Sequence, residues 1–281
     1  MKEQIRKTLE ALAAADGGKA GTCEFLPPDR QEVVKVIHEL TALLFPLMSR
    51  REYPGMTDEA LLSQAIYRLS GQVSGALRFR GATESEARET ADRICEQFTA
   101  RLPEIKRLLL LDVNALYEGD PAAVSREEVM ITYPGFRAIT IYRMAHELYA
   151  LNAPLIPRIM TEYAHERTGI DIHPGATIGE YFFIDHGTGI VVGETTVIGH
   201  HVKLYQGVTL GARSFELDEN GNPVKKIKRH PNIGNHVVIY ANATILGGDT
   251  TVGDHCVIGG NTWLTHSVEA GSVISYREDR E

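Results

Sequence analysis

Cysteine is scarce in this chain. Its 281 residues include three cysteines, Cys23, Cys95 and Cys256, which are far apart and form no C-x-x-C pair. Widely spaced cysteines in an odd number are typical of reduced thiols in a cytoplasm rather than of a disulfide framework or a zinc site. We therefore expect a cytoplasmic protein.

Long apolar runs and basic patches are also lacking. Purely apolar stretches such as Leu108–Leu111 are far too short to cross a bilayer, and the charged N-terminus has no apolar signal core. The net charge is −8, and the one basic run, KKIKRH, is short. A phosphate-binding G-x-x-x-x-G-K-[ST] loop is absent as well. These features argue against membrane, nucleic acid and ATP as partners.

A six-residue apolar period stands out in the C-terminal half. It fits neither a helix of 3.6 residues per turn nor the alternation of a strand, but it fits a parallel β-helix with three hexads per coil. We predict a left-handed β-helix over residues 170–276, with an extruded loop at 213–228 that turns at Asn220-Gly221. The residues that mark the predicted register are Ile172, Ile178, Ile184, Ile190, Thr196, Val202, Val208, Ile233, Ile239, Ile245, Thr251 and Val257.

The N-terminal half has helical periodicity. Val33, Ile37, Leu40 and Leu44 recur at three and four positions, and Thr83 and Ser125 each precede a glutamate by three residues, as in a capping box. Helices are predicted over about 136–151 and 154–168, the second ending at Gly169. We expect an α+β chain with an N-terminal extension and linker (1–28), an α-helical domain (29–169) and the β-helix (170–276).

Several motifs together resemble one family. DIHPGATIG, IDHGTGIVVGE, GVTLGA and KRHPNIG, preceded by NALYEGDPAA and GFRAITIYRMAHELY, are similar to serine acetyltransferase and extend from Asn114 to the C-terminus. The resemblance implies an acyltransferase that moves the acetyl group of acetyl-CoA to the hydroxyl of L-serine, the first step of cysteine biosynthesis. The hexad period alone indicates only an acyltransferase-like β-helix.

His186 is the candidate general base. A serine hydroxyl is a weak nucleophile at neutral pH, and an imidazole is well suited to accept its proton. Asp171 precedes His186 by 15 residues, three fewer than an 18-residue coil, so the two side chains are expected to approach across a corner. The spacing is equally compatible with a structural ion pair. The resemblance implies a base and the acid that orients it.

Four residues are candidates for binding L-serine. The resemblance assigns Asp185 and Asp120 to the amino end, and an ammonium group does call for carboxylate partners. Arg229 and His230 are suited to the carboxylate end, because an arginine fork binds a carboxylate in a bidentate manner. Each has a simpler explanation: Asp185 as a solvated corner residue, Asp120-Pro121 as a helix start, and the basic run as a solvated loop.

Small residues are candidates for contacting acetyl-CoA. Gly211 and Ala212 stand where the hexad register breaks, and the resemblance adds Ala241 and Gly260 as backbone contacts. Glycine and alanine also turn β-helix corners without binding anything. The cysteines lie outside the matched motifs, so a covalent acyl-enzyme is not expected. The donor that stabilises the oxyanion is not identified by the sequence.

The resemblance also implies partners. We expect a homo-oligomer, either a trimer or a dimer of trimers, with L-cysteine as a feedback inhibitor that competes for the serine pocket. Many family members carry a longer tail ending in isoleucine, which binds cysteine synthase; the sequence SVISYREDRE has no such tail, so that complex is not expected.

Three alternatives to serine acetylation remain open at this stage. One is an acyltransferase for a sugar or antibiotic hydroxyl, and another is a binding scaffold without catalysis. The third is a metal-dependent carbonic anhydrase, for which three of the histidines would have to converge on a metal ion. We expect no metal. The histidines concerned are His173, His186, His200, His201, His230, His236 and His255.

Overall fold

Helices make up the first part of the chain. The computed structural model describes residues 1–15, 27–225 and 227–275, so most of the predicted linker lies outside the described residues. A short 3-10 turn, Arg50–Glu52, follows α3. The helices are α1 (Lys2–Ala15), α2 (Arg30–Leu44), α3 (Pro46–Ser49), α4 (Asp58–Phe79), α5 (Glu84–Gly119), α6 (Arg126–Thr132), α7 (Pro134–Ala150) and α8 (Ile156–Thr168).

The helix ends follow the local signals in the sequence. Thr83 and Glu86 form the predicted capping box of α5, and the Ser125 side chain accepts the Glu128 N–H at the start of α6. Gly169 ends α8 with φ +70°, in the left-handed region that glycine tolerates. These predicted boundaries are confirmed within two residues.

One suggested helix start is wrong. Asp120 does not open a helix with Pro121; it is the C-cap residue of α5, and its N–H donates to the Leu116 carbonyl. Its Oδ1 accepts the Ala122 N–H at 2.8 Å, which forms a turn before α6 begins at Arg126. Aspartate favours such side-chain turns as strongly as it favours helix starts, so the local pattern did not distinguish them.

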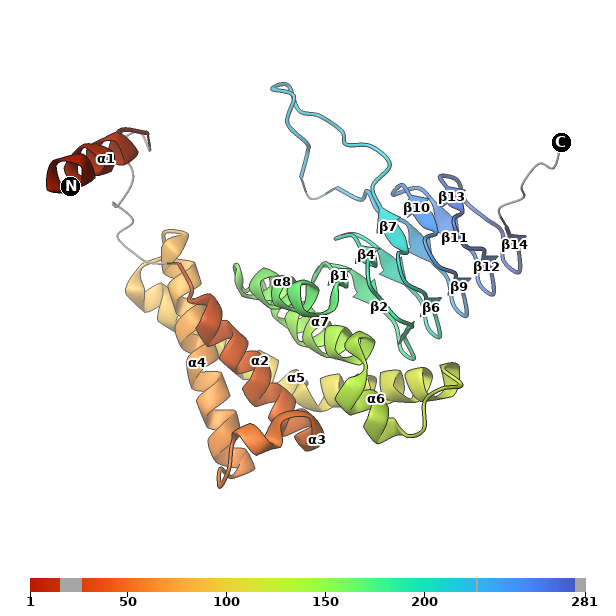
Figure 1. Cartoon of the computed structure of the whole chain (residues 1–281), viewed down its shortest axis with the longest axis horizontal. Helices are drawn as coiled ribbons and strands as arrows, with labels where there is room; N and C mark the ends of the chain where they lie inside the picture. Colours follow the sequence, from red (N-terminus) through yellow and green to blue (C-terminus); the bar gives the residue numbers. More distant parts are fainter. Residues whose placement is uncertain (16–26, 226, 276–281) are drawn as a thin grey trace.

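The second part of the chain winds through three parallel sheets (Figure 1). The first sheet has the order β1-β4-β7-β10-β13, the second β11-β8-β5-β2 and the third β14-β12-β9-β6-β3. Successive strands up to β13 pass from one sheet to the next, so three strands complete a coil. The strands are β1 (Asp171–Ile172), β2 (Thr177–Ile178), β3 (Phe183–Ile184), β4 (Val191–Val192), β5 (Val197–Ile198), β6 (Lys203–Leu204), β7 (Thr209–Gly211), β8 (Asn232–Ile233), β9 (Val238–Ile239), β10 (Thr244–Leu246), β11 (Thr251–Val252), β12 (Val257–Ile258), β13 (Trp263–Leu264) and β14 (Val273–Ile274).

The predicted apolar register is kept only in part. Ile172 pairs with Val192 and not with Ile190, so the inward strand position moves by two residues after Ile184 and returns to the marked residues at Ile233. It shifts again after Ile245. The marked residues from Ile172 to Ile245 are all buried, whereas Thr251 is exposed and Val257 only partly buried. Val252 and Ile258 point inward in their place. The reason is one additional residue in the corner after β10, where Gly247 adopts φ +110°.

The predicted insertion leaves the coil between β7 and β8. It folds back on itself through an antiparallel bridge between Leu217 and Pro223, and Figure 1 shows it projecting away from the sheets. Gly221 turns the tip with φ +77°, as the Asn-Gly pair predicts.

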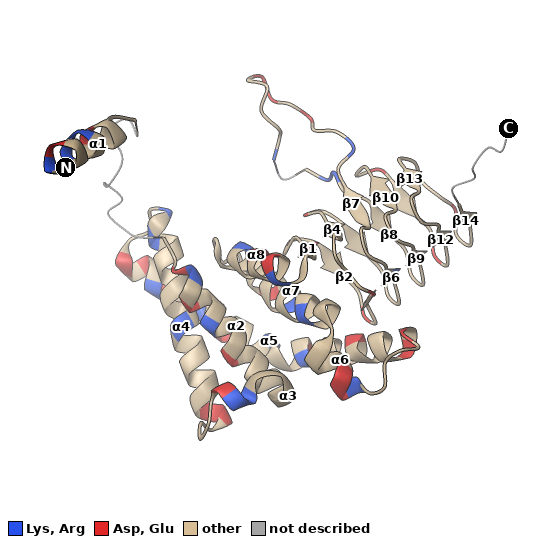
Figure 2. Ribbon diagram, viewed as in Figure 1, with Lys and Arg blue, Asp and Glu red and all other residues tan. Residues whose placement is uncertain are grey.

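The helical part packs against the first coil. A Cβ atom on Gly119 would lie 2.6 Å from the Phe183 ring, and one on Gly135 would lie 2.9 Å from the Ile184 carbonyl oxygen. Most charged residues lie on the helices, and the coil carries few (Figure 2). Among the described residues, no helix is both long and apolar enough to cross a membrane.

Candidate active site

His186 occupies one edge of the coil, where the third sheet turns into the first. We call residues 185–191, 205–208, 240–243 and 259–262 the His186 edge. Asp171 pairs with Val191 and Val191 with Thr209, so the first coil is two residues longer than the second. The additional residues lie in the corner that carries His186, whose φ is +55° and whose side chain is 73% exposed. The longer corner therefore presents the imidazole to solvent.

Two carboxylates lie beside His186. Asp185 Oδ1 is 3.6 Å from His186 Nδ1. Asp120 reaches the same edge from the end of α5 and accepts a hydrogen bond from the Tyr133 hydroxyl at 2.5 Å. That bond is the main cause that lowers the pKa of Asp120, and the nearby His186 lowers it further. The same contact raises the pKa of Tyr133 to about 12. At neutral pH Asp120 is therefore an anion facing the edge.

Asp171 lies close to the His186 corner but does not bond to His186. A Cβ atom on Gly187 would lie 2.5 Å from the Ile170 side chain, so the two segments are in contact. The Asp171 carboxylate lies 4.0 Å from His165 Nδ1 instead. The expected approach of the two segments is present, and the expected bond between Asp171 and His186 is not.

A second set of predicted residues lies on another edge, where the first sheet turns into the second. We call residues 173–176, 193–196, 211–212, 229–231 and 246–250 the His230 edge. His230 is 7% exposed, and its Nδ1 accepts the Thr195 N–H at 3.1 Å. Burial and then the charge of Arg229 lower the pKa of His230 to about 4. His230 is thus neutral at pH 7, with its proton on Nε2 as a hydrogen-bond donor.

Arg229 is oriented by a carboxylate that sequence reasoning did not single out. It pairs with Glu194 at 2.5 Å, and the Tyr149 hydroxyl donates to the same carboxylate at 3.0 Å. Glu194 and Tyr149 line a cavity of about 780 Å³ together with His173 and Thr195. Glu194 closes the motif IDHGTGIVVGE, which was the available signal in the sequence.

The residues suggested for acetyl-CoA divide between the two edges. Ala241 and Gly260 lie on successive coils of the His186 edge, where Asn261 N–H donates to the Ala241 carbonyl. Gly211 and Ala212 lie on the His230 edge, beside Leu246. The structure therefore brings together Asp120, Asp185 and His186 on one edge, and Arg229 and His230 on another.

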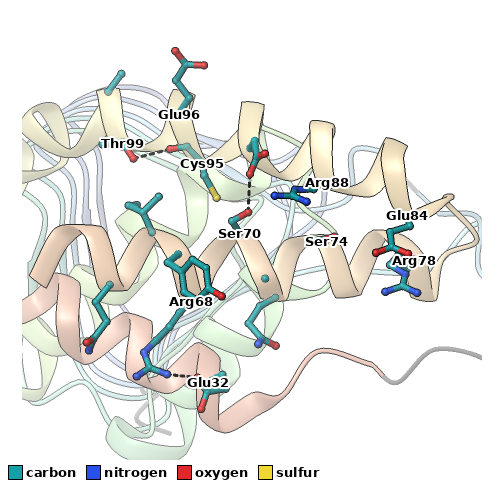
Figure 3. A pocket seen from close by; sticks show the side chains of 17 residues that line it. Glu32, Arg68, Ser70, Ser74, Arg78, Glu84, Arg88, Cys95, Glu96 and Thr99 are labelled. Atoms are coloured by element: carbon teal, nitrogen blue, oxygen red, sulfur yellow. Dashed lines mark hydrogen bonds and ion pairs between the residues drawn. The ribbon is translucent and has the colours of Figure 1, made fainter. Parts of the chain in front are cut away.

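A cavity larger than the one beside Glu194 lies away from both edges. It is an open groove of about 1280 Å³ between α2, α4 and α5, shown in Figure 3. Its side chains are engaged with one another: Arg68 pairs with Glu32, and Ser70 donates to Asp92 at 2.9 Å. Size alone therefore does not indicate the reactive site, and the convergent acids beside His186 do so better.

The histidines do not converge on one point. His201, His236 and His255 stack on the remaining edge with ring centroids 4.7 Å apart, whereas His186 and His230 lie on the other two. Within the described ranges, no group of three or more His, Cys, Asp or Glu side chains is arranged to hold a metal ion.

Comparison with known proteins decides the family. The chain is 47% identical over 274 residues to a plasmid-encoded serine acetyltransferase of Synechococcus elongatus, a match that covers 92% of this chain and 84% of that protein. The chain belongs to the serine acetyltransferase family. It is therefore an acyltransferase. No family model matches it.

Solved structures of this family have the same fold. Entamoeba histolytica serine acetyltransferase 1 in complex with L-cysteine superimposes with a TM-score of 0.75 at 36% identity, covering 85% of this chain and 86% of that one. A serine acetyltransferase in complex with CoA superimposes with a TM-score of 0.58 at 28% identity, covering 87% and 96%. In fold, the helical part followed by parallel sheets agrees with these members of the family.

Proposed function

We propose that this chain transfers the acetyl group of acetyl-CoA to the hydroxyl of L-serine, with His186 as the general base. The observation that carries the proposal is the exposed His186 imidazole beside the carboxylates of Asp185 and Asp120. An imidazole there takes the hydroxyl proton as the serine oxygen attacks the thioester carbonyl. The two acids attract the ammonium group of the same amino acid.

We propose Asp171 as the acid that orients His186. The contact of Ile170 with Gly187 supports this role, because it places the segments that carry Asp171 and His186 side by side. A carboxylate bonded to one ring nitrogen leaves the other free to accept the proton and stabilises the imidazolium that results.

The carboxylate of L-serine is assigned to Arg229 and the Nε2–H of His230. These groups lie on a different edge from His186, so one chain alone does not present both ends of the site. We infer that the His186 edge of one copy faces the His230 edge of the next. Contacts between unlike patches close into rings, and we propose a ring of three, alone or as a pair of rings.

The type of β-fold and the domain boundaries are also proposals. We propose that the three sheets form a left-handed β-helix over residues 170–276, with the 213–228 insertion. Residues 29–169 would form the helical domain that contributes Asp120, and residues 1–28 an extension. The hexad spacing and the strand order support this division.

Two further properties are proposed. L-cysteine shares the ammonium and carboxylate of L-serine, so the same groups would bind it as an inhibitor; the complex of the Entamoeba relative with L-cysteine supports this. Cys95 and Cys256 are buried free thiols, which supports a reducing cytoplasmic setting.

The test is release of CoA from acetyl-CoA in the presence of L-serine. We expect His186→Ala to lower kcat by about 10²- to 10⁴-fold, the usual contribution of a general base. His255→Ala is the matched control, because His255 is an exposed histidine on the remaining edge of the coil, where it stacks on His236. Equal activity of His186→Ala and His255→Ala would refute the assignment of the base.

Alternative acceptors test the substrate. L-homoserine and a galactoside are assayed beside L-serine with the same donor. CoA release that depends on the galactoside and not on L-serine would keep the acyltransferase and discard the proposed acceptor.

A further inference from the structure

Two tyrosines on the His186 edge have no part in the reaction as assigned above. Tyr205 follows β6 and Tyr240 follows β9, and the strand register places them in one row with Asp185. Their rings stack with centroids 5.1 Å apart and planes 17° from parallel. The Phe183 ring packs against the Tyr205 ring with centroids 6.0 Å apart, which holds the Tyr205 end of the row in place. The two rings thus form a rigid wall.

The hydroxyl groups of this wall are not used within the chain. In the part of the chain that the structure describes, neither the Tyr205 nor the Tyr240 hydroxyl has a hydrogen-bond partner. Tyr205 is partly buried and Tyr240 is 44% exposed. Tyrosine hydroxyls in such settings ordinarily find a partner, so the wall is suited to a ligand with both polar and apolar parts.

One end of the His186 edge is closed to the acyl donor. The first coil is covered by the helical part, where Gly119 contacts Phe183 and Gly135 contacts Ile184. The donor arm must therefore run away from the helices, across the successive coils of the His186 edge.

Along that direction the side chains in the row that begins with His186 become smaller. It continues one coil on at Gln206 and then at Ala241 and Gly260, which leave room beside the backbone. The tyrosine row lies beside this row, because the two rows begin at the consecutive residues Asp185 and His186. A donor arm that follows the small residues therefore passes the tyrosine hydroxyls in turn.

We propose that Tyr205 and Tyr240 bind the two amide groups of the pantetheine arm of acetyl-CoA. This inference rests on the proposed function. The amide nitrogens of pantetheine are separated by a β-alanine unit, which spans about 5 Å, one bond more than an extended α-amino acid. The stacked rings are 5.1 Å apart, which matches this spacing. Tyr205, one coil from His186, takes the amide nearer the sulfur, and Tyr240 takes the farther one.

Donors of graded length test the assignment. S-acetyl-N-acetylcysteamine carries only the nearer amide, whereas S-acetylpantetheine and acetyl-CoA carry both. We expect Tyr205→Phe to lower kcat/KM about fivefold with all three donors, the effect of one lost hydrogen bond. We expect Tyr240→Phe to do so with the two longer donors and to leave the short donor unchanged. The KM for L-serine should not change in either variant.

Tyr181→Phe is the matched control. Tyr181 is also a stacked tyrosine, with its ring 4.4 Å from that of His201, but it lies on the remaining edge of the coil. Removing the Tyr181 hydroxyl should leave kcat/KM unchanged with all three donors. A Tyr240→Phe effect that is the same for the short and the long donors, or absent for all of them, would overturn the proposal.

A binding measurement separates this inference from the choice of acceptor. Calorimetry with CoA and no acceptor should give a dissociation constant about fivefold weaker for Tyr240→Phe than for the unaltered chain. An unchanged constant overturns the inference. Weaker CoA binding together with no acetylation of L-serine would support the tyrosine assignment and refute the proposed acceptor.

Discussion

The candidate carboxylate-binding end depends on one planar side chain. Arg229 is held by Glu194, which leaves part of its guanidinium fork for a ligand. Lysine keeps the charge but loses the fork. We expect Arg229→Lys to raise the KM for L-serine about tenfold or more, since hydrogen bonds to charged groups are worth ~1.5 to 3 kcal/mol. Steady-state kinetics measure this, and Arg213→Lys in the exposed insertion is the control. An unchanged KM would contradict the assignment.

Gly193 is needed by the neighbouring imidazole. A Cβ atom at this position would lie 2.0 Å from His230 Cδ2 and 2.2 Å from Nε2. Gly193→Ala must therefore displace the ring, and we expect a loss of about 1 to 3 kcal/mol in the free energy of unfolding together with a higher KM for L-serine. Urea unfolding and kinetics check both. Gly75→Ala, where nothing lies within 4 Å, should instead stabilise the chain slightly.

At the scale of elements, one buried ion pair fastens the helices to the coil. Arg143 of α7 bonds Asp112 of α5 through two nitrogens, at 2.6 and 2.9 Å, and also donates to the Gly179 carbonyl at 2.9 Å. Asp112 in turn accepts the Phe182 N–H at 3.0 Å. The pair thus links two helices to the strand that precedes His186.

Breaking this pair should be costly. We expect Arg143→Met to lower the free energy of unfolding by about 3 to 5 kcal/mol, because it leaves the Asp112 charge buried without a partner. The double variant Asp112→Leu/Arg143→Met should recover much of that loss. Arg101→Met, which breaks the exposed pair with Glu147, should cost less than about 1 kcal/mol in urea unfolding. Equal losses for Arg143→Met and Arg101→Met would contradict this account.

The elements that the sequence predicted well are those set by short-range chemistry. The caps at Thr83 and Gly169 and the burial of the marked residues from Ile172 to Ile245 depend on residues within one turn or one coil. The strand register was missed after Ile184, where the corner is two residues longer, and again after Ile245, where one added corner residue shifts the later positions. The turn at Asp120 was missed because aspartate serves turns and helix starts equally.

The arrangement of the candidate site was less predictable. Motif order indicated Asp185, His186, Arg229 and His230, but not that they occupy two different edges. That separation follows from strand order and from a corner lengthened by two residues, neither of which a hexad count reveals. The contact of Glu194 with Arg229 joins segments that are far apart in the sequence, so residue spacing did not predict it.

At the scale of the whole molecule, histidines should make the fold sensitive to acid. Burial is the first cause that lowers the pKa values of His173, His201 and His230, the last to about 4. The unfolded chain therefore binds more protons below its own histidine pKa near 6.5. Stability is complete above that pH and is lost as the pH falls, with His230 contributing about 3 kcal/mol by pH 4. Urea unfolding at pH 7.5 and 4.5 measures the loss, and His230→Gln should reduce it.

The proposed ring of three chains has a built-in reporter. The His186 edge and the His230 edge both border the first sheet, so pairing these edges around a three-fold axis turns the outer face of that sheet toward the axis. Trp263, the single tryptophan, lies on this face in β13 and is 69% exposed in one chain. Assembly should bury it and shift its fluorescence emission to shorter wavelength.

Dilution and substitution test this assembly. We expect the emission to move to longer wavelength on dilution, together with a fall in the mass measured by sedimentation. Trp263→Glu should dissociate the ring, because a charge would be buried between copies, and serine acetylation should fall with the mass if the site requires two chains. Val273→Glu is the control, since Val273 is 72% exposed but lies on the third sheet. Full activity of a Trp263→Glu variant that sediments as a single chain would contradict a site shared between copies.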